Sequence, residues 1–447
     1  MDGRTIPGSV PNTPPEAKAT LTGTLIGPAL LVPFLAQIDS CVVRKEWYQF
    51  NAVGAALVVL GAVFIMALKS YGRELGVALR WSQGLIGGFA VLAIAALFGS
   101  MLPDAFLQEG LKYVLYPTAD AVLFTLAVCA SVVCRRDATW RLAAAAAMGL
   151  IVASIVWDSV SPGTFSELST RAAGFGVNPN TGGAIVALLL IGLLDWERGG
   201  FHPAALTALA ISGMGVFLTL SRSALLSWGV VSGAYLLRTL IARGTSAWLA
   251  GAVLTVPVVL FAATAGEWAR SAFPMLQASH QRIEAFLGGF DDMDHADDSR
   301  VHIAEEFFDM AMESPWVGWG TGLNSTTEEG AHNIYLARWV ENGLVALLAM
   351  IFLVIGTYRV GRRTGSHELC ILAGYVFVQG FFSHNLLEDK SLLMMWGILA
   401  GRAALRHDAA LQAAAGQLHV MTASRAERPI RRRRANAALP GEAAALT

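Results

Sequence analysis

A histidine at the start of an apolar run is the first side chain here that could perform acid–base chemistry. His332 opens the segment AHNIYLARWVENGLVALL, in which the chain enters an apolar stretch after a glycine-rich turn. A neutral imidazole at such a mouth could abstract a proton near physiological pH. A lone histidine can equally be structural, so its position alone leaves both interpretations open.

An arginine between two apolar runs is the second such residue. Arg222 lies in LTLSRSALLSW, where almost no loop separates the runs. A guanidinium at this place costs free energy unless it faces water, a lipid headgroup or an anion. Snorkelling of the side chain to the interface is the alternative. Position alone does not separate these two interpretations.

A second arginine precedes a predicted helix start. Arg171 lies in RAAGFGVNPNTGGA, and the NPN triplet predicts a turn into a helix with Asn180 as its cap. A helix N-terminus beside an arginine could bind an anion. A capped loop with an exposed arginine is the alternative interpretation.

An aspartate-rich segment surrounds His295 and ends at Arg300, in the sequence DDMDHADDSR. Such a cluster could hold a divalent cation, but its spacing does not match the EF-hand pattern, and a solvated acidic loop is the favoured interpretation. Arg300 is then an ion-pair partner unless other arginines accompany it. We expect neither a metal site nor a cofactor.

The composition excludes several protein classes. Of 447 residues, 55% are hydrophobic and only 15% are charged, against about 25% in soluble domains. Mean hydropathy is +0.53, so a polytopic membrane protein is expected. The net charge of −1 gives no case for nucleic-acid binding. The four scattered cysteines suggest neither disulfides nor a metal site.

Nucleotide-driven chemistry is also disfavoured. The sequence contains no zinc motif, Walker A sequence, GxSxG elbow or Rossmann fingerprint. An enzyme of this kind would need an already activated substrate that reaches it from the membrane.

Apolar runs of spanning length predict an all-α protein with about 12 transmembrane helices. Residues 1–20 are proline-rich and polar, and we interpret them as a disordered cytoplasmic arm before a retained first span rather than a cleavable signal. Residues 21–405 form the membrane domain, and 406–447 a basic tail. The predicted spans are 21–38, 50–68, 82–101, 112–134, 141–157, 181–195, 203–220, 222–238, 246–265, 335–357, 367–386 and 388–405.

Basic residues predict the orientation. They gather in alternate loops, for example at Arg135, Arg136 and Arg141, and again in the C-terminal run 431–434. The positive-inside rule makes this side cytoplasmic, with both termini on it. The opposite side then carries two long segments, 158–180 and 266–334, the second lying between the ninth and tenth spans.

The larger outer segment contains an amphipathic stretch from Val301 to Met312. Helical spacing puts Val301, Ala304, Phe307, Phe308 and Ala311 on one face. Asp298 or Ser299 could cap its start, and Pro315 closes its end. We expect a helix lying on the outer membrane face.

Taken in order, five stretches resemble the O-antigen ligase and polymerase superfamily of bacterial envelope enzymes. They are RAAGFGVNPNTGGAIVALLL, LTLSRSALL, DSRVHIAEEFFDMAMESPWVGWGTGLN, AHNIYLARWVENGLVALL and SHNLLEDKSLLMMWGILAG. Each is a weak pattern, but their order and spacing make the joint match specific. It covers roughly the C-terminal two thirds of the chain.

The resemblance implies glycosyl transfer, inverting and metal-independent, on the periplasmic face of the bacterial inner membrane. The donor would be a polyprenyl-pyrophosphate-linked glycan, and the acceptor a hydroxyl of a glycan or lipid such as lipid A–core. The resemblance makes His332 the general base or the residue that positions the acceptor, and Arg222 and Arg300 the cations that hold pyrophosphate. Arg171, Asn180 and Asn333 would support substrate binding.

Other activities stay open. A polymerase of O-antigen or exopolysaccharide repeat units shares the expected donor and fold, as does a protein O-oligosaccharyltransferase. A transporter or flippase would instead place charged groups near the bilayer middle and show related halves. The residues singled out above gather at the outer ends of spans, which disfavours transport.

Overall fold

Every regular element in the described part of the chain is helical. The computed structural model describes residues 21–47, 51–102, 110–197, 200–243, 294–326 and 330–437. Its elements are α1 (Leu21–Leu35), α2 (Ile38–Arg44), α3 (Ala52–Ser70), α4 (Gly72–Gly99), α5 (Gly110–Ala130), α6 (Asp137–Val160), η1 (Gly174–Gly176), α7 (Pro179–Leu193), α8 (Pro203–Leu218), α9 (Arg222–Arg243), α13 (Asp294–Glu313), α14 (Leu323–Thr326), α15 (Ile334–Thr364), α16 (His367–Gly380), η3 (Leu386–Glu388) and α17 (Lys390–Ala437).

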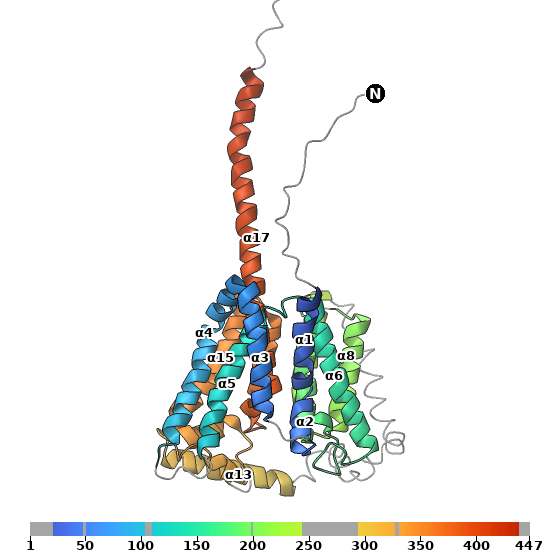
Figure 1. Cartoon of the computed structure of the whole chain (residues 1–447), viewed down its shortest axis with the longest axis vertical. Coiled ribbons are helices and arrows are strands. Elements are labelled where there is room, and N and C mark those ends of the chain that lie inside the picture. The colour runs from blue at the N-terminus through green and yellow to red at the C-terminus, as the bar shows by residue number, and fades with distance from the viewer. Residues whose placement is uncertain are drawn as a thin grey trace, which may run out of the picture.

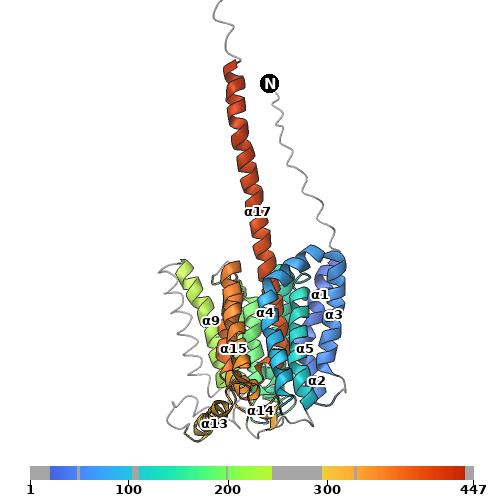
Figure 2. The ribbon, with the colours of Figure 1, turned by 90° about the vertical axis from the view of Figure 1, so that its left-hand side faces the viewer.

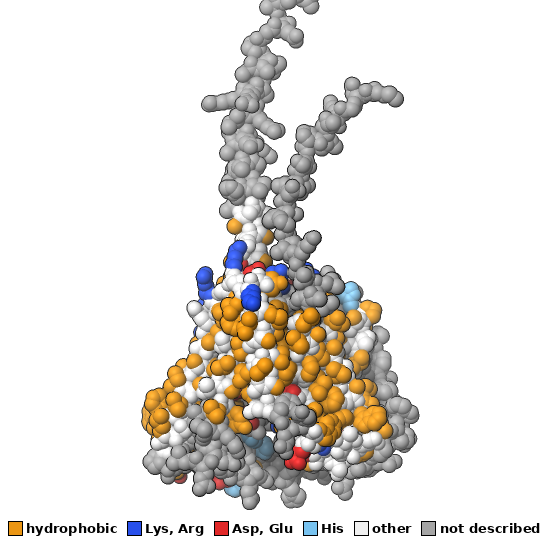
Figure 3. Space-filling view, viewed as in Figure 1, with side chains coloured by type: hydrophobic (Ala, Val, Ile, Leu, Met, Phe, Trp, Pro, Cys, Tyr) orange, Lys and Arg blue, Asp and Glu red, His pale blue; other side chains and the backbone are white. Residues whose placement is uncertain are grey.

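The helices form a bundle suited to a bilayer. Within the described residues, five helices are long and apolar enough to cross a membrane, or six if α1 and α2 form one bent span, and three further apolar helices are shorter. Large apolar side chains such as Val58, Phe98 and Leu142 point outward. Figure 3 shows hydrophobic side chains over the face of the bundle that it presents. The chain is therefore a polytopic membrane protein.

The predicted spans agree with the observed helices in place but not in every boundary. Each predicted span except 246–265 overlaps a helix, and 246–265 and the predicted arm 1–20 lie outside the described residues. The largest difference is α17, which was expected to end at 405 and continues as a helix to Ala437. Sequence hydropathy marks where a helix leaves an apolar environment, not where its hydrogen bonding ends.

Helix α17 packs in the middle of the bundle. Trp396 is fully buried and lies edge-on to Phe89 of α4, with ring centroids 5.3 Å apart. Gly397 lets α17 approach α5 closely, because a Cβ there would lie 2.6 Å from the carbonyl oxygen of Phe124. Small residues commonly permit such contact between membrane helices.

The first span is broken near the start of α17. Helices α1 and α2 meet at 41°, and Gln37 between them has φ 61°. The Gln37 amide donates to Asp389 Oδ1 at 2.7 Å. Lys390 Nζ lies 2.7 Å from Asp39 Oδ2 in a buried ion pair. The start of α17 thus holds the break in place.

The two ends of the bundle differ. Helix α17 projects from one end, where Lys and Arg side chains are also visible (Figures 1 and 3). Helix α13 lies across the opposite end, nearly perpendicular to the bundle, and Figure 2 shows it from a second direction. We call this the α13 end. It also holds the connections 161–178, 219–221, 314–333 and 381–389.

Helix α13 has a narrower buried face than the sequence predicts. Phe307 and Ala311 are buried as expected, together with Ile303, but Val301 and Phe308 are exposed. The helix also begins at Asp294, before the predicted caps. Its buried face packs on α15, so the apolar stripe is divided between a protein contact and an exposed edge.

Candidate active site

The entry into α15 fixes the position of His332. Asn333 caps the helix, since its side-chain oxygen accepts hydrogen bonds from the backbone N–H groups of Tyr335 at 2.9 Å and Leu336 at 3.2 Å. The N–H of Ala331 donates to Asn324 Oδ1 at 2.7 Å. Between these anchors His332 has φ 50°. A left-handed conformation at a non-glycine residue is strained, and such strain concentrates at functional sites.

A second histidine faces His332. The ring of His384, from the connection between α16 and α17, lies edge-on to that of His332, with centroids 5.6 Å apart. The backbone of Gly330 packs on His384, because a Cβ there would lie 2.8 Å from Cε1. Burial, with His332 and Arg338 nearby, lowers the pKa of His384 to about 4. His384 is therefore a neutral imidazole at physiological pH.

The glycine-rich segment before His332 is bonded into a break in α15. Gly343 has φ 73° and interrupts the helix, so that carbonyl groups of the preceding turn accept other donors. Trp319 N–H donates to Val340 O at 2.8 Å and Gly320 N–H to Glu341 O at 3.1 Å. A Cβ on Gly343 would lie 2.1 Å from Trp316 O. Only glycine fits here, and the segment supports the mouth rigidly.

An ion pair lies one turn below the mouth. Arg338 Nη1 is 3.1 Å from Glu341 Oε2, and both side chains are largely buried. The other carboxylate oxygen of Glu341 accepts the N–H of Asn324 at 3.3 Å. Asn324 thus connects this pair to Ala331 beside His332.

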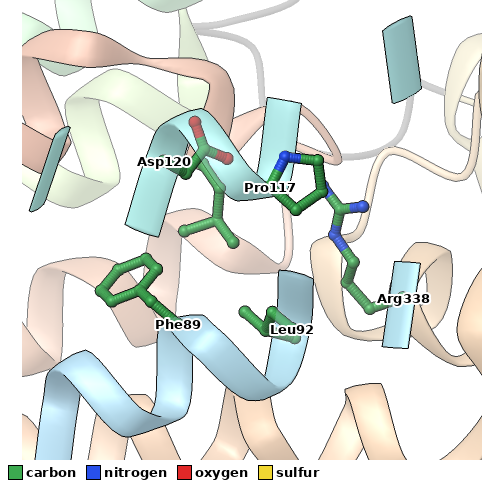
Figure 4. A pocket seen from close by; sticks show the side chains of 6 residues that line it. Phe89, Leu92, Pro117, Asp120 and Arg338 are labelled. Carbon is green, nitrogen blue, oxygen red and sulfur yellow. The ribbon is translucent and has the colours of Figure 1, made fainter. Parts of the chain in front are cut away.

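The Arg338–Glu341 pair lines a recess, which we define by Tyr116, Pro117, Asn324, Arg338, Glu341, His384, Asn385 and Glu388. Its volume is about 360 Å³ including its open mouth. A second pocket shares Pro117 and Arg338 with it, is lined further by Phe89, Leu92, Asp120 and Leu387, and is counted with the recess from here on. In Figure 4, Asp120 and Arg338 lie on either side of Pro117, with Phe89 and Leu92 on α4 below.

Two carboxylates of the recess have no hydrogen-bond partner in the part of the chain that the structure describes. Asp120 is 9% exposed, and neither it nor Glu388 is hydrogen-bonded through its side chain there. Burial raises the pKa of Glu388, which Arg338 partly offsets. The Nε–H of Arg338 is also buried without an acceptor.

A second polar group lies at the α13 end between α7 and α9. Arg171 donates to Asn180 Oδ1 at 2.9 Å and to the carbonyl oxygen of Thr219 at 3.2 Å. Ser221 Oγ donates to the same Asn180 oxygen at 2.9 Å. Asp158 anchors the connection that carries Arg171, since its carboxylate accepts the N–H of Ala173 at 2.9 Å. We call this the Arg171 group.

Asn180 does not cap α7, as the sequence suggested. The cap is Asn178, whose side chain accepts the N–H of Asn180 at 2.9 Å. Pro179 is the first residue of the helix, a position that proline favours because its nitrogen needs no acceptor there. This shift by two residues leaves the Asn180 side chain to bond Arg171 and Ser221.

Arg222 is exposed and begins α9 next to the Arg171 group. Ser221 caps this helix through the N–H of Ala224 at 3.3 Å. One turn further, Ser227 Oγ donates to Gln379 at the end of α16, at 2.8 Å. The start of α9 is therefore tied to the helix that leads into His384. Arg300 lies in α13, and its side chain is outside the description.

The structure groups the predicted residues in two places. His332 and Asn333 adjoin at the mouth of α15, whereas Arg171 and Asn180 bond each other beside Arg222. The sequence analysis missed His384, Arg338, Glu341, Asp120 and Glu388. A usable signal existed for Asp120, Arg338 and Glu341, because ionisable residues within apolar spans are rare and functional. Within the described residues, no three His, Cys, Asp or Glu side chains are placed to hold a metal ion.

Comparison with protein families supports the resemblance seen in the sequence. A family model described as O-antigen ligase matches residues 207–351, which include α9, α13, His332 and the Arg338–Glu341 pair. No curated protein matches the chain.

Proposed function

We propose, from the match of residues 207–351 to the O-antigen ligase family model, that this chain transfers a polyprenyl-pyrophosphate-linked glycan to an acceptor hydroxyl. The observation that carries the proposal is the strained His332 beside a neutral His384, at the same end of the bundle as Arg171 and Arg222. A base for the acceptor and cations for the leaving group are the two functions that such a transfer needs.

The reaction is a single displacement at the anomeric carbon. His332 takes the proton of the acceptor hydroxyl while its oxygen forms a bond to that carbon. The bond from the carbon to the pyrophosphate oxygen breaks, and its electron pair leaves with the lipid pyrophosphate. Attack opposite the leaving group inverts the configuration. Such a base typically contributes about 10² to 10⁴ in rate.

The arginines stabilise the charge that develops on the leaving group. Arg222 and Arg300 hold the pyrophosphate, and Arg171, with Asn180, has a supporting role. A guanidinium keeps its charge at any working pH and can bond two phosphate oxygens at once, which an ammonium cannot. In a partly dehydrated site such fixed donors act more strongly than in water.

The proposed orientation follows from the basic residues. The connection with Arg135 and Arg136, the first turns of α6 with Arg141, and the start of the α17 extension lie at the end opposite α13. The positive-inside rule makes that end cytoplasmic. The α13 end would then face the periplasm of a bacterial inner membrane, with about 12 spans and both termini in the cytoplasm.

The same donor and fold also suit a polymerase that joins O-antigen or exopolysaccharide repeat units, which is the second candidate. A ligase transfers the donor glycan to a separate lipid or protein acceptor, whereas a polymerase extends lipid-linked chains without one. A reconstituted assay with lipid-linked donor and several acceptors separates them, because chain growth without added acceptor contradicts the ligase proposal.

The test of the chemistry is His332→Ala in this assay. Transfer should fall by about 10² to 10⁴, while the variant inserts and melts like the unchanged protein. His302→Ala on the exposed face of α13 is the matched control and should retain full activity. Retained activity in His332→Ala would remove this residue as the base.

A further inference from the structure

The recess between α5, α15 and η3 has the composition of a sugar site. Its floor is apolar at Phe89, Leu92 and Leu387, and its wall holds carboxylates, one guanidinium and amide groups. A sugar ring likewise has C–H faces, which pack on apolar or aromatic groups, and a rim of hydroxyl groups. Binding sites for small molecules combine an apolar lining with few polar groups.

Asp120 indicates that a ligand completes the recess. Its side chain is more than nine-tenths buried, lines the adjoining pocket and is hydrogen-bonded to no described residue, so its carboxylate oxygens, which keep contact with the open space of that pocket, are available to a ligand. A buried polar group without a partner is costly, and such groups in folded proteins are nearly always satisfied. The buried Nε–H of Arg338 on the other side of Pro117 also lacks an acceptor. Hydroxyl groups of a ligand can donate to the Asp120 carboxylate and accept from the Nε–H of Arg338.

The charges of the recess select the kind of sugar. The lining carries three carboxylates, those of Asp120, Glu341 and Glu388, and one guanidinium, that of Arg338. Arg44 of α2 also acts on Glu388 from outside the lining, so the carboxylates still outnumber the cations. An anionic ligand would meet an excess of negative charge, whereas neutral hydroxyl groups can donate to carboxylates at no such cost. Donor pyrophosphate is therefore disfavoured here, and an uncharged sugar is preferred.

The recess also lies next to the proposed base. His384 lines its wall and contacts the ring of His332. Helix α16, which leads into His384, is in turn bonded to α9 through Gln379 and Ser227, next to Arg222. We propose that the recess is the acceptor subsite and binds a neutral, hydroxyl-rich sugar through Asp120, Arg338 and Glu388. This assignment of the acceptor rests on the proposed function, whereas sugar binding itself does not.

The test is binding of simple glycosides to the full chain in nanodiscs, followed by saturation-transfer NMR. The probes are a neutral methyl hexopyranoside and the corresponding methyl hexuronide, which differ by one carboxylate. The neutral glycoside should bind the unchanged protein, and Asp120→Asn and Glu388→Gln should each weaken it about tenfold, the effect of one hydrogen bond to a charged group. The hexuronide should bind more weakly than the neutral probe.

Matched controls are Asp309→Asn and Glu305→Gln, which change the same residue types on the exposed face of α13. They should bind the neutral glycoside normally. Glu388 lies outside the spanning helices, so its variant remains informative if Asp120→Asn does not fold. Equal binding by Glu388→Gln and the unchanged protein, preference for the hexuronide, or no binding of either probe would overturn the proposal.

Transfer assays distinguish this proposal from the proposed function. Glycoside binding that depends on Glu388, in a protein that transfers nothing, would retain the sugar site and remove the transferase. Normal transfer in Glu388→Gln, with an unchanged apparent KM for acceptor, would retain the transferase and remove the acceptor subsite.

Discussion

Two arginines at the α13 end of the bundle have opposite kinds of partner. They are Arg171, in the Arg171 group, and Arg338, in the recess. Arg171 donates to a side-chain amide and a backbone carbonyl, neither of which carries a formal charge. Arg338 is paired with Glu341 and faces two further carboxylates. Neutral acceptors orient a cation while preserving its attraction for anions, whereas carboxylates neutralise it. Under the proposed function, the first arginine serves the anionic donor and the second the uncharged acceptor.

The largest expected effect is on stability and follows from removing Arg338. Arg338→Met leaves Glu341 buried without its cation, and loss of one partner of a buried pair costs about 3–5 kcal/mol. Arg171→Met removes the hydrogen bonds to Asn180 and to the carbonyl oxygen of Thr219, neither of which carries a formal charge, at a cost of about 1–2 kcal/mol. Thermal melts of the purified variants measure both, and equal losses would contradict the difference between the two regions.

The next effect is the pH dependence of stability that comes from His384, in the wall of the recess. Burial lowers the pKa of His384 from 6.5 to about 4, so the unfolded chain binds a proton below pH 6.5 that the folded protein does not. Its contribution is complete above pH 6.5 and is lost as the pH falls through about 4, by up to about 3 kcal/mol. Glu388 acts in the opposite direction, because its pKa is raised on folding.

His384→Phe should therefore flatten the decline of the melting temperature between pH 6.5 and 4.5. His302→Ala on α13 should decline like the unchanged protein, since His302 is exposed. A decline of the same size in His384→Phe would assign the pH dependence to other groups.

A smaller effect concerns the kind of cation at the start of α9. Arg222→Lys keeps the charge but loses the paired donors, so kcat/KM for the lipid-linked donor should fall about tenfold, equivalent to about 1.4 kcal/mol. The apparent KM for the acceptor should not change. Normal donor kinetics in this variant would show that charge alone suffices and would argue against a pyrophosphate clamp.

The smallest effect should come from Ser221→Ala, which removes one of two donors to Asn180 and the cap of α9. A lost hydrogen bond or cap costs about 1 kcal/mol, and donor kcat/KM should fall only a few-fold. A change in acceptor KM instead would mean that the Arg171 group serves both substrates.

The sequence predicted the helices well because hydropathy and length determine where a chain can span a bilayer. It also predicted a turn before α7 and the end of α13, since proline and asparagine act locally. It did not predict that Asn178 rather than Asn180 is the cap, because either amide could bond the first turn. In the folded protein the Asn180 side chain bonds Arg171 and Ser221 instead of capping α7, and these contacts are set by the tertiary fold.

The recess could not be predicted from local patterns. Asp120 and Arg338 are separated by more than two hundred residues and meet only through the packing of α4, α5, α15 and α17. The break in α15 at Gly343 could not be predicted either. Glycine is required there because the carbonyl oxygen of Trp316, in another segment, lies where a Cβ would be. Contacts of this kind are set by the tertiary fold, and the predicted roles of His332, Arg222 and Arg300 remain predictions.

Helix α17 runs from the α13 end of the bundle to beyond the opposite end. Its first residue, Lys390, holds the break between α1 and α2 next to the recess, and its last described turns lie beyond the opposite end. A helix of 48 residues is about 70 Å long at 1.5 Å per residue. Within it, Trp396 contacts Phe89 in the lining of the recess, so one helix joins the recess to the part of the chain outside the opposite end of the bundle.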